Sequence, residues 1–185
     1  MPQIKTILKD RLKSAQRVAV LGIGSQLRAD DAAGLIIAKE LKTYFKDKKK
    51  RNLLKVFLGE TAPENLTGQI KKFKPTHLVV IDAVDFHLKT GDLRVVDICT
   101  EAGVSFSTHR VPIGILRDYL YKSIHCETIL IGMQPGSTEF CGGLSPGIQE
   151  STQAACKEIR EVLKSFILSR TKNVRSSIQL LRSRL

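Results

Sequence analysis

The sequence predicts an α/β fold: a three-layer α/β/α arrangement with a mostly parallel, twisted sheet of five strands. Short, continuous apolar runs recur along the chain, which is the pattern of strands buried on both faces of a parallel sheet. Segments with helical spacing of apolar residues separate these runs. Strands that alternate with helices in this way fold into a sheet covered on both sides.

The first two predicted strands enclose one long helix. A charged, amphipathic stretch at 3–15 predicts an N-terminal helix, and the apolar run Arg17–Gly24 (RVAVLGIG) predicts the first buried strand. Apolar residues at helical spacing over Asp30–Phe45 predict the next helix, and Leu53–Leu58 (LLKVFL) predicts the second strand.

A helix start follows the second strand. Thr61 is expected to be the N-cap, Pro63 lies in the first turn, and Glu64 takes the reciprocal position of a capping box. This helix should run to about Phe73.

The second half of the chain supplies three more strands. These are His77–Ala83 (HLVVIDA), a short edge strand at Leu93–Asp97, and Glu127–Met133 (ETILIGM). A helix at Val111–Lys122 lies between the last two strands, and a long final helix is predicted over Ser145–Leu168.

The whole chain, 1–185, is predicted to be a single domain, because it contains no internal repeat, low-complexity linker or domain boundary. Its α/β core should span about 17–168, preceded by the N-terminal helix and followed by a basic C-terminal tail. The tail at 171–185 should either form one more helix or fray. Apolar residues make up 42% of the chain, with no Trp, so we expect an aliphatic core.

The formal net charge of +12 is concentrated in two places. Residues 42–51 form a dense basic run, and from Lys164 to the end there are six Lys or Arg residues and no acid. Such runs can bind nucleic acid, membranes or acidic proteins. No interleaved aromatic signature of RNA binding accompanies them, so we interpret them as a solvated loop and a basic terminal helix and consider nucleic acid unlikely.

The four cysteines, Cys99, Cys126, Cys141 and Cys156, are scattered and form no Cys-x-x-Cys pair. A zinc knuckle or redox dithiol is therefore not indicated, and buried thiols in a reducing compartment are expected. No signal peptide opens the chain, and its apolar runs are too short to span a bilayer. These features predict a cytoplasmic protein without a membrane partner; its oligomeric state is open, with a monomer favoured.

Ligands of parallel α/β sheets bind at the carboxyl ends of the strands. The first strand ends in Gly22-Ile23-Gly24, but the dinucleotide fingerprint needs a further glycine where this chain has Leu27. We therefore interpret the two glycines as allowing a tight turn and a close backbone approach.

The loop after the first strand carries Asp30 and Asp31 to the start of the long helix. One of them suffices as an N-cap, so Asp30 is assigned to capping and Asp31 to the cleft. Asp82 follows the apolar residues of the third strand, where it either accepts loop amides or belongs to a site. Asp85, three residues later, is interpreted as a loop residue.

His109 precedes the helix that begins near Pro112. It either makes local hydrogen bonds there or meets Asp31 and Asp82. Two carboxylates and one imidazole suit a divalent transition ion, and three ligands leave coordination positions open. No Ser or Cys has a convincing base partner in the sequence, so covalent catalysis is not expected.

Four segments in this order resemble the [NiFe]-hydrogenase maturation endopeptidase family. They are GIGSQLRADDAAG (Gly22–Gly34), VVIDAVD (Val79–Asp85), STHRVPIGIL (Ser107–Leu116) and GMQPGSTEFCGGLSP (Gly132–Pro146). The stretch Gly59–Asp97 most resembles the branch that processes the hydrogenase 3 of formate hydrogenlyase.

The resemblance implies an endopeptidase that removes a C-terminal extension from the nickel-loaded [NiFe]-hydrogenase large-subunit precursor. It places the family's nickel-binding acid on Asp31, the second acid on Asp82 and the histidine on His109. It also makes Gly24, Gly59 and Thr108 candidate substrate-binding residues.

The nickel would be carried by the substrate, and no tightly bound cofactor of the enzyme's own is expected. The catalytic acids would be Asp31 and Asp82, in an aspartic-type or metal-dependent reaction. A rival hypothesis is a non-catalytic nickel-checking module that binds the precursor without cutting it.

Overall fold

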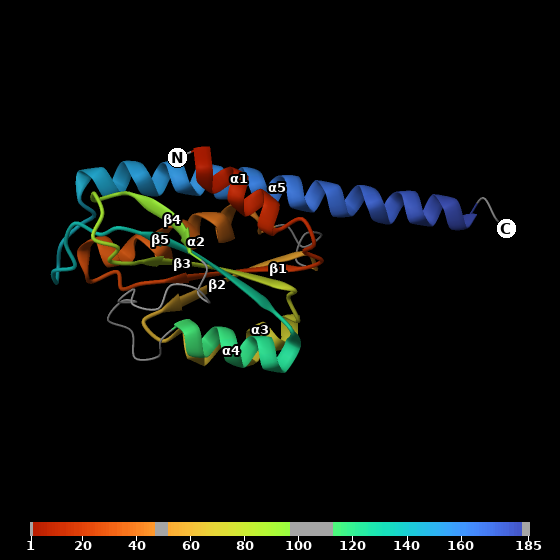
Figure 1. The fold of residues 1–185 in the computed structure, drawn as a ribbon, viewed down its shortest axis with the longest axis horizontal. Helices are drawn as coiled ribbons and strands as arrows, with labels where there is room; N and C mark the ends of the chain where they lie inside the picture. The colour runs from red at the N-terminus through yellow and green to blue at the C-terminus, as the bar shows by residue number, and fades with distance from the viewer. Residues whose placement is uncertain (1, 47–51, 97–112, 183–185) are drawn as a thin grey trace.

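The computed structural model describes residues 2–46, 52–96 and 113–182, with side chains described over 4–46, 52–96 and 113–172. The chain folds into three layers, with a sheet between two layers of helices (Figure 1). The predicted α/β architecture is confirmed.

The sheet has five strands in the order β2-β1-β3-β5-β4. The strands are β1 (Val18–Ile23), β2 (Leu54–Glu60), β3 (His77–Ala83), β4 (Leu93–Val96) and β5 (Glu127–Met133). β1 pairs in parallel with β2 and β3, and β3 pairs in parallel with β5. β4 lies at one edge of the sheet, as expected for the short strand, and it runs antiparallel to β5.

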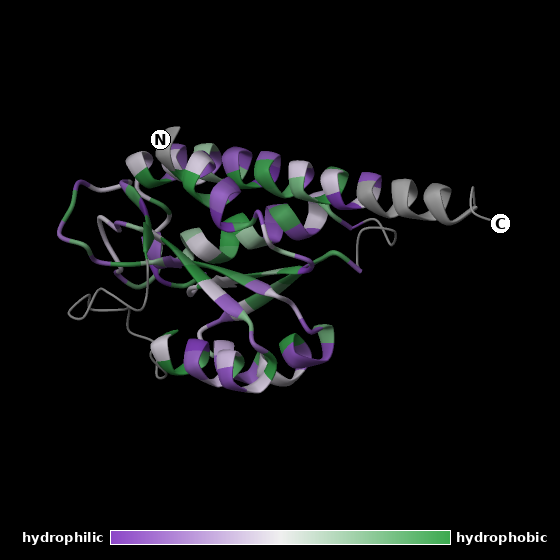
Figure 2. Cartoon of the chain, turned by 45° about the vertical axis from the view of Figure 1, so that its right-hand side comes forward, coloured by the Kyte–Doolittle hydropathy of each residue, from purple (hydrophilic) through white to green (hydrophobic). Residues whose placement is uncertain are grey.

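The helices are α1 (Pro2–Arg11), α2 (Ala33–Tyr44), α3 (Thr67–Phe73), α4 (Ile113–Ile124) and α5 (Pro146–Arg182). Helices α1, α2 and α5 cover one face of the sheet, and α3 and α4 cover the other (Figure 1). In Figure 2 the strands are mostly hydrophobic, while the helices alternate hydrophobic and hydrophilic residues. Each helix therefore buries one stripe against the sheet.

Two apolar clusters, one on each face of the sheet, form the core. Every residue of β1 and β3 is buried, which accounts for their continuous apolar sequence. Both clusters are mainly aliphatic, as the composition predicts. Cys126 and Cys156 are buried, but Cys141 is exposed, so the expectation of buried thiols is wrong for Cys141.

Four predicted helix boundaries are wrong. The N-terminal helix, expected over 3–15, ends at Arg11. The helix expected from Asp30 begins as a separate 3-10 turn, η1 (Ala29–Ala32), ahead of α2. The helix expected from Thr61 begins as another, η3 (Pro63–Leu66), whose N-cap is Ala62. The final helix does not end at Leu168 but continues without a break to Arg182, since no Gly or Pro interrupts that sequence.

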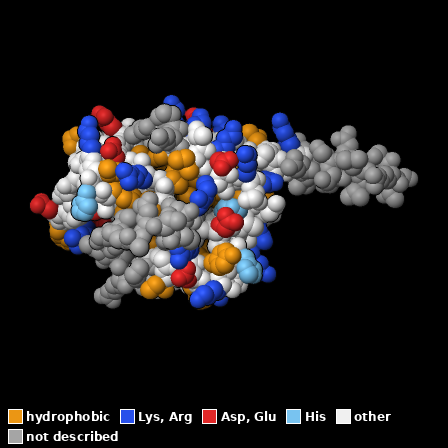
Figure 3. Space-filling view, in the orientation of Figure 1, with side chains coloured by type: hydrophobic (Ala, Val, Ile, Leu, Met, Phe, Trp, Pro, Cys, Tyr) orange, Lys and Arg blue, Asp and Glu red, His pale blue; other side chains and the backbone are white. Residues whose placement is uncertain are grey.

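Among the side chains that the structure describes on the face drawn in Figure 3, Lys and Arg are scattered between acidic and apolar side chains and form no single stripe. Within the described residues, no helix combines the length and apolar content needed to cross a lipid bilayer.

Candidate active site

The parallel strands β1, β2, β3 and β5 end at the same edge of the sheet. Asp31 lies in η1, just after β1, and Asp82 is the next-to-last residue of β3. Both carboxylates are buried, and η1 contacts β3 directly. Two acids that are distant in the sequence therefore lie at the same edge of the sheet, on two elements, η1 and β3, that contact each other.

Gly24 allows the backbone carrying Asp31 to pass directly beneath the end of β1. A Cβ at this position would lie 1.8 Å from the carbonyl oxygen of Asp31, and Gly24 has φ +132°. Any other residue would both clash and adopt an unfavourable backbone conformation. The interpretation of this glycine as a close-approach residue is confirmed.

Gly34 allows a similar close approach of backbone segments at the start of α2. A Cβ here would lie 2.3 Å from the carbonyl oxygen of Ile81 and 2.6 Å from that of Ile23. The helix therefore rests on the main chain of β1 and β3 at once. Since Ile81 precedes Asp82, this contact fixes the start of α2 beside the end of β3.

Asp31 is held by its own loop. Its Oδ2 accepts a hydrogen bond of 2.7 Å from the backbone N–H of Ser25. Asp82 is fully buried and stands opposite Gly132 of β5 in the strand register.

Gly59 lies at a β-bulge at the end of β2. The register shifts there, so that Gly22 is opposite Leu58 and Ile23 is opposite Glu60. The N–H of Gly24 then donates to the carbonyl of Glu60 at 3.0 Å. Gly24 directly follows β1, and Gly59 belongs to the adjacent strand β2. These two candidate substrate-binding residues therefore lie at the same edge of the sheet as the acids.

The assignment of Asp30 to capping the helix that follows it is wrong. Neither η1 nor α2 has a side-chain cap hydrogen bond. Instead, the carboxylate of Asp30 accepts backbone hydrogen bonds from Gly136 (2.8 Å), Ser137 (2.9 Å) and Ser145 (2.7 Å), and another from the Ser145 hydroxyl. Asp30 thus fixes the segment that joins β5 to α5.

The buried carboxylate of Asp30 remains ionised because these donors surround it. Burial alone would raise its pKa, but hydrogen bonds from Ser145, Ser137 and Gly136 outweigh burial and lower the pKa below the ordinary value. The loop after β1 and the segment after β5 are also joined by backbone hydrogen bonds from Asp30 N to Ser137 O (3.0 Å) and from Cys141 N to Leu27 O (2.8 Å).

Gln134 is a structural residue of this edge that the sequence analysis missed. Its Oε1 accepts hydrogen bonds from the backbone N–H groups of Phe86 (2.7 Å) and Leu88 (3.2 Å), and its Nε2 donates to Asp85 Oδ1 (3.1 Å). It therefore fixes the loop that follows Asp82. The available signal was a polar residue directly after the last buried strand.

His109 and Thr108 lie outside the described residues, in the range 97–112. The meeting of His109 with Asp31 and Asp82 therefore stays a prediction. Over the part of the chain that the structure describes, no group of three or more His, Cys, Asp or Glu side chains is placed to hold a metal ion.

Comparison with known proteins identifies the family. The family model described as hydrogenase maturation protease matches residues 35–162. The chain belongs to the hydrogenase maturation protease family. As a member of this family it is a peptidase of hydrogenase maturation.

Individual relatives of the hydrogenase maturation protease family agree. A protein of Methanocaldococcus jannaschii assigned as a hydrogenase maturation protease is 32% identical over 90% of this chain and 100% of its own length. The hydrogenase 3 maturation protease of Escherichia coli K12 is 29% identical over 76% of this chain and 86% of its own.

The fold agrees as well. The crystal structure of a [NiFe] hydrogenase maturation protease from Thermococcus kodakarensis is similar with a TM-score of 0.77 and 32% identity, covering 85% of this chain and 99% of that chain.

Proposed function

We propose that this hydrogenase maturation protease removes a C-terminal extension from the nickel-loaded large-subunit precursor of a [NiFe] hydrogenase. The names of its relatives support a hydrogenase precursor as substrate, and one of them is a hydrogenase 3 maturation protease. The observation that carries the proposal is the pair of buried acids, Asp31 and Asp82, on touching elements at the carboxyl edge of the sheet.

Nickel held by the substrate is the group that Asp31, Asp82 and His109 would recognise. Both carboxylates are buried, and a buried carboxylate is costly unless a cation or several donors accompany it. A nickel ion in the precursor supplies that cation, and an imidazole from His109 completes a mixed oxygen and nitrogen ligand set. The enzyme would carry no tightly bound cofactor of its own.

Binding of the substrate's nickel positions the scissile peptide bond. A fixed orientation of reacting groups can lower a barrier by about 7 kcal/mol or more. A water molecule, activated by the ion or by one of the two acids, adds to the peptide carbonyl, and the leaving amine takes up a proton. Asp31 and Asp82 are both candidates for the general base, so the reaction is either aspartic-type or metal-dependent.

We assign substrate binding to the edge of the sheet that carries Gly24 and Gly59 and to the segment before α4. Gly24 and Gly59 lie at the ends of β1 and β2, and the space where each would carry a side chain is filled by the protein itself. Their contribution to substrate binding would therefore come through the main chain. Thr108 would act from the neighbourhood of His109. We place the reaction in the cytoplasm, in keeping with the free thiols of Cys126, Cys141 and Cys156.

The test is to incubate the protein with nickel-loaded precursor and to measure the mass of the large subunit. Loss of a C-terminal peptide supports the proposal. Binding without any loss of mass would favour the non-catalytic nickel-checking module instead.

Two substitutions test the site residues. Asp31→Asn and His109→Ala should each abolish processing while the melting temperature stays close to that of the unchanged protein. Asp10→Asn is a matched control, because Asp10 is an exposed acid of α1 that pairs with Lys13. Full activity of either site variant would remove that residue from the proposed site.

A further inference from the structure

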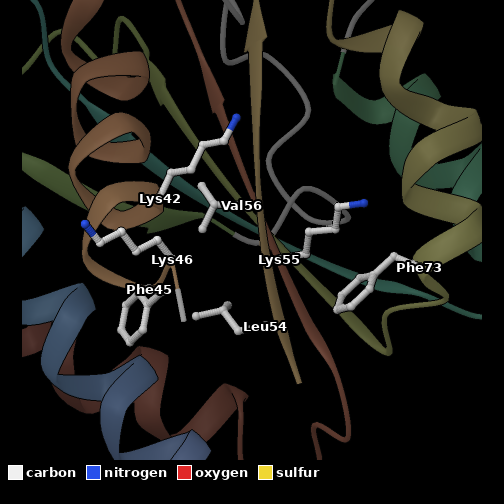
Figure 4. A pocket seen from close by; sticks show the side chains of 7 residues that line it. All are labelled: Lys42, Phe45, Lys46, Leu54, Lys55, Val56 and Phe73. Atoms are coloured by element: carbon white, nitrogen blue, oxygen red, sulfur yellow. The ribbon is translucent and has the colours of Figure 1, made fainter. Parts of the chain in front are cut away.

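A pocket far from the two acids opens along the outer strand of the sheet. It has a volume of about 400 Å³ and lies where β2 begins. Figure 4 shows Lys42 of α2, with Phe45 and Lys46 directly after this helix, on one side of β2, and Lys55 and Phe73 on the other side. Because the acids lie at the carboxyl ends of the strands, this pocket belongs to a different part of the surface.

The floor of the pocket includes the edge of a strand. Among the strands that the structure describes, β2 lies at the edge of the sheet and pairs with β1 alone. The N–H of Val18 donates to the carbonyl of Leu53, and Val18 is opposite Leu54. In a parallel ladder this places the N–H and C=O groups of Leu54 and Val56 on the side away from β1.

Leu54 and Val56 both line the pocket, although their side chains belong to the buried core. It is therefore the main chain of Leu54 and Val56, and not their side chains, that faces the pocket at the outer edge of β2. This edge makes no backbone hydrogen bond to the described part of the chain. A strand edge of this kind is a template for an added strand from another chain.

Positive charge lies on both sides of this edge. Lys42 lines the pocket from α2, Lys46 lines it from the segment just after α2, and Lys55 lines it from β2 itself. The Lys55 Nζ lies over the Phe57 ring, 5.0 Å from its centre, so the charged group itself makes a cation–π contact beside the pocket. Phe45 and Phe73 supply apolar surface beside these lysines.

We propose that this pocket is a docking site for an extended, acidic segment of a partner protein, which adds to β2 as a further strand. Its main chain pairs with Leu54 and Val56, its acidic side chains lie near the lysines, and an apolar side chain contacts Phe45 and Phe73. Edge lysines oppose pairing with neutral or basic strands but attract an acidic one. Nucleic acid is a weaker match, because aliphatic residues and outward backbone groups form the floor.

The probe for this site is a fluorescein-labelled nine-residue peptide of alternating glutamate and valine, with a lysine–valine peptide of equal length as the control. Fluorescence anisotropy in low salt should show saturable binding of the acidic peptide alone. Hydrogen exchange should slow at the amides of Leu54 and Val56 when this peptide is bound. Unchanged exchange at both amides would overturn strand addition.

Charge reversal tests the lysines without disturbing the core. The double variant Lys42→Glu, Lys55→Glu should weaken peptide binding at least 10-fold. The matched control Lys9→Glu, Lys122→Glu makes the same change in net charge on other exposed positions of α1 and α4 and should leave binding within twofold. Equal weakening in both variants would reduce the interaction to non-specific charge and overturn the site.

A third variant tests the backbone. Val56→Pro removes an outward N–H while it keeps the ladder to β1, and it should abolish peptide binding in a protein that still cleaves precursor. Tighter binding of single-stranded RNA than of the acidic peptide, lost in the same lysine variant, would assign the pocket to nucleic acid instead. Peptide binding that persists in both the proline and the lysine variants would also refute the proposal.

Discussion

The carboxylate of Asp30 accepts hydrogen bonds from both the backbone N–H and the hydroxyl of Ser145, 115 positions later in the chain. Asp30 adjoins Asp31, and Ser145 immediately precedes α5. The turn that carries the proposed nickel-binding acid is thereby joined to the start of the longest helix. The relationship makes Asp30 a supporting residue of the site and leads to the first prediction.

Replacing Asp30 by Asn should lower the free energy of unfolding at pH 7 by about 2–3 kcal/mol. The amide has one acceptor oxygen fewer than the carboxylate, and its NH₂ group would face backbone donors. Urea unfolding of both proteins measures the difference. An Asp30→Asn protein as stable as the unchanged one would contradict the role given to these hydrogen bonds.

The difference in free energy of unfolding between the unchanged protein and Asp30→Asn should depend on pH. The pKa of Asp30 is lowered in the fold, so its stabilising contribution is complete above the unfolded value of about 3.9 and is lost as the pH falls through the lower folded value. The stability gap between the two proteins should therefore narrow below about pH 4. A gap that stays constant from pH 7 to pH 2.5 would show that Asp30 titrates alike in both states.

Gly24→Ala should abolish processing of the precursor and destabilise the protein by at least about 2 kcal/mol. The added Cβ would meet the carbonyl oxygen of Asp31, and Ala would have to adopt a positive φ. Activity and urea unfolding are measured together. Gly68→Ala is the matched control, because a Cβ at Gly68 would meet nothing within 4 Å; equal losses in both variants would rule out the close approach as the cause.

His77 should make the protein less stable as the pH falls from 7 to 5. Burial lowers the pKa of His77, with Arg11 and Arg170 acting in the same direction and Glu127 opposing them. A depressed folded pKa means that the stabilising contribution is present above about pH 6.5, the unfolded value, and is lost as the pH falls through the folded value.

The variant His77→Gln should cost about 1–2 kcal/mol at pH 7, because the ring contacts Thr76 Oγ1 at 3.0 Å and Ser14 Oγ at 3.4 Å. The difference in free energy of unfolding between the unchanged protein and His77→Gln should become smaller from pH 7 to pH 5. This pH range lies well above the range in which Asp30 titrates. Urea unfolding at pH 7, 6 and 5 measures the difference, and a difference that grows toward pH 5 would reverse the assigned sign.

The described cysteines should differ in reactivity. Burial raises the pKa of the Cys126 thiol to about 12 and, together with Glu40, that of Cys156 to about 12. In a Cys99→Ser background at pH 8, Ellman's reagent should modify Cys141 at once and the other two thiols only after denaturation. Fast modification of more than one thiol in the native protein would show that the buried cysteines are accessible.

The sequence was most informative where apolar runs are continuous. β1, β3 and β5 lie within about a residue of their expected positions, because burial on both faces leaves little choice of residue type. The order of the strands could not be predicted in this way, since it depends on which neighbours pair rather than on any one strand's composition.

Predictions from local capping rules were less successful. The sequence around Thr61 matches a capping box, yet the turn is capped by Ala62 without a side-chain hydrogen bond. Asp30 also matches a helix cap, but its partners come from 136–145. In both places a tertiary arrangement overrides a local preference, and no pattern within four or five residues could have revealed it.

The contact of Gly34 with the carbonyl groups of Ile23 and Ile81 is made by backbone atoms alone. The separation between the turn that carries Asp31 and the strand that carries Asp82 is consequently independent of which aliphatic side chains fill the interior. Exchange among Val, Ile and Leu beneath this edge should therefore leave the spacing of the two acids unchanged, so the geometry of the proposed site depends on the main chain and not on the packing of the core.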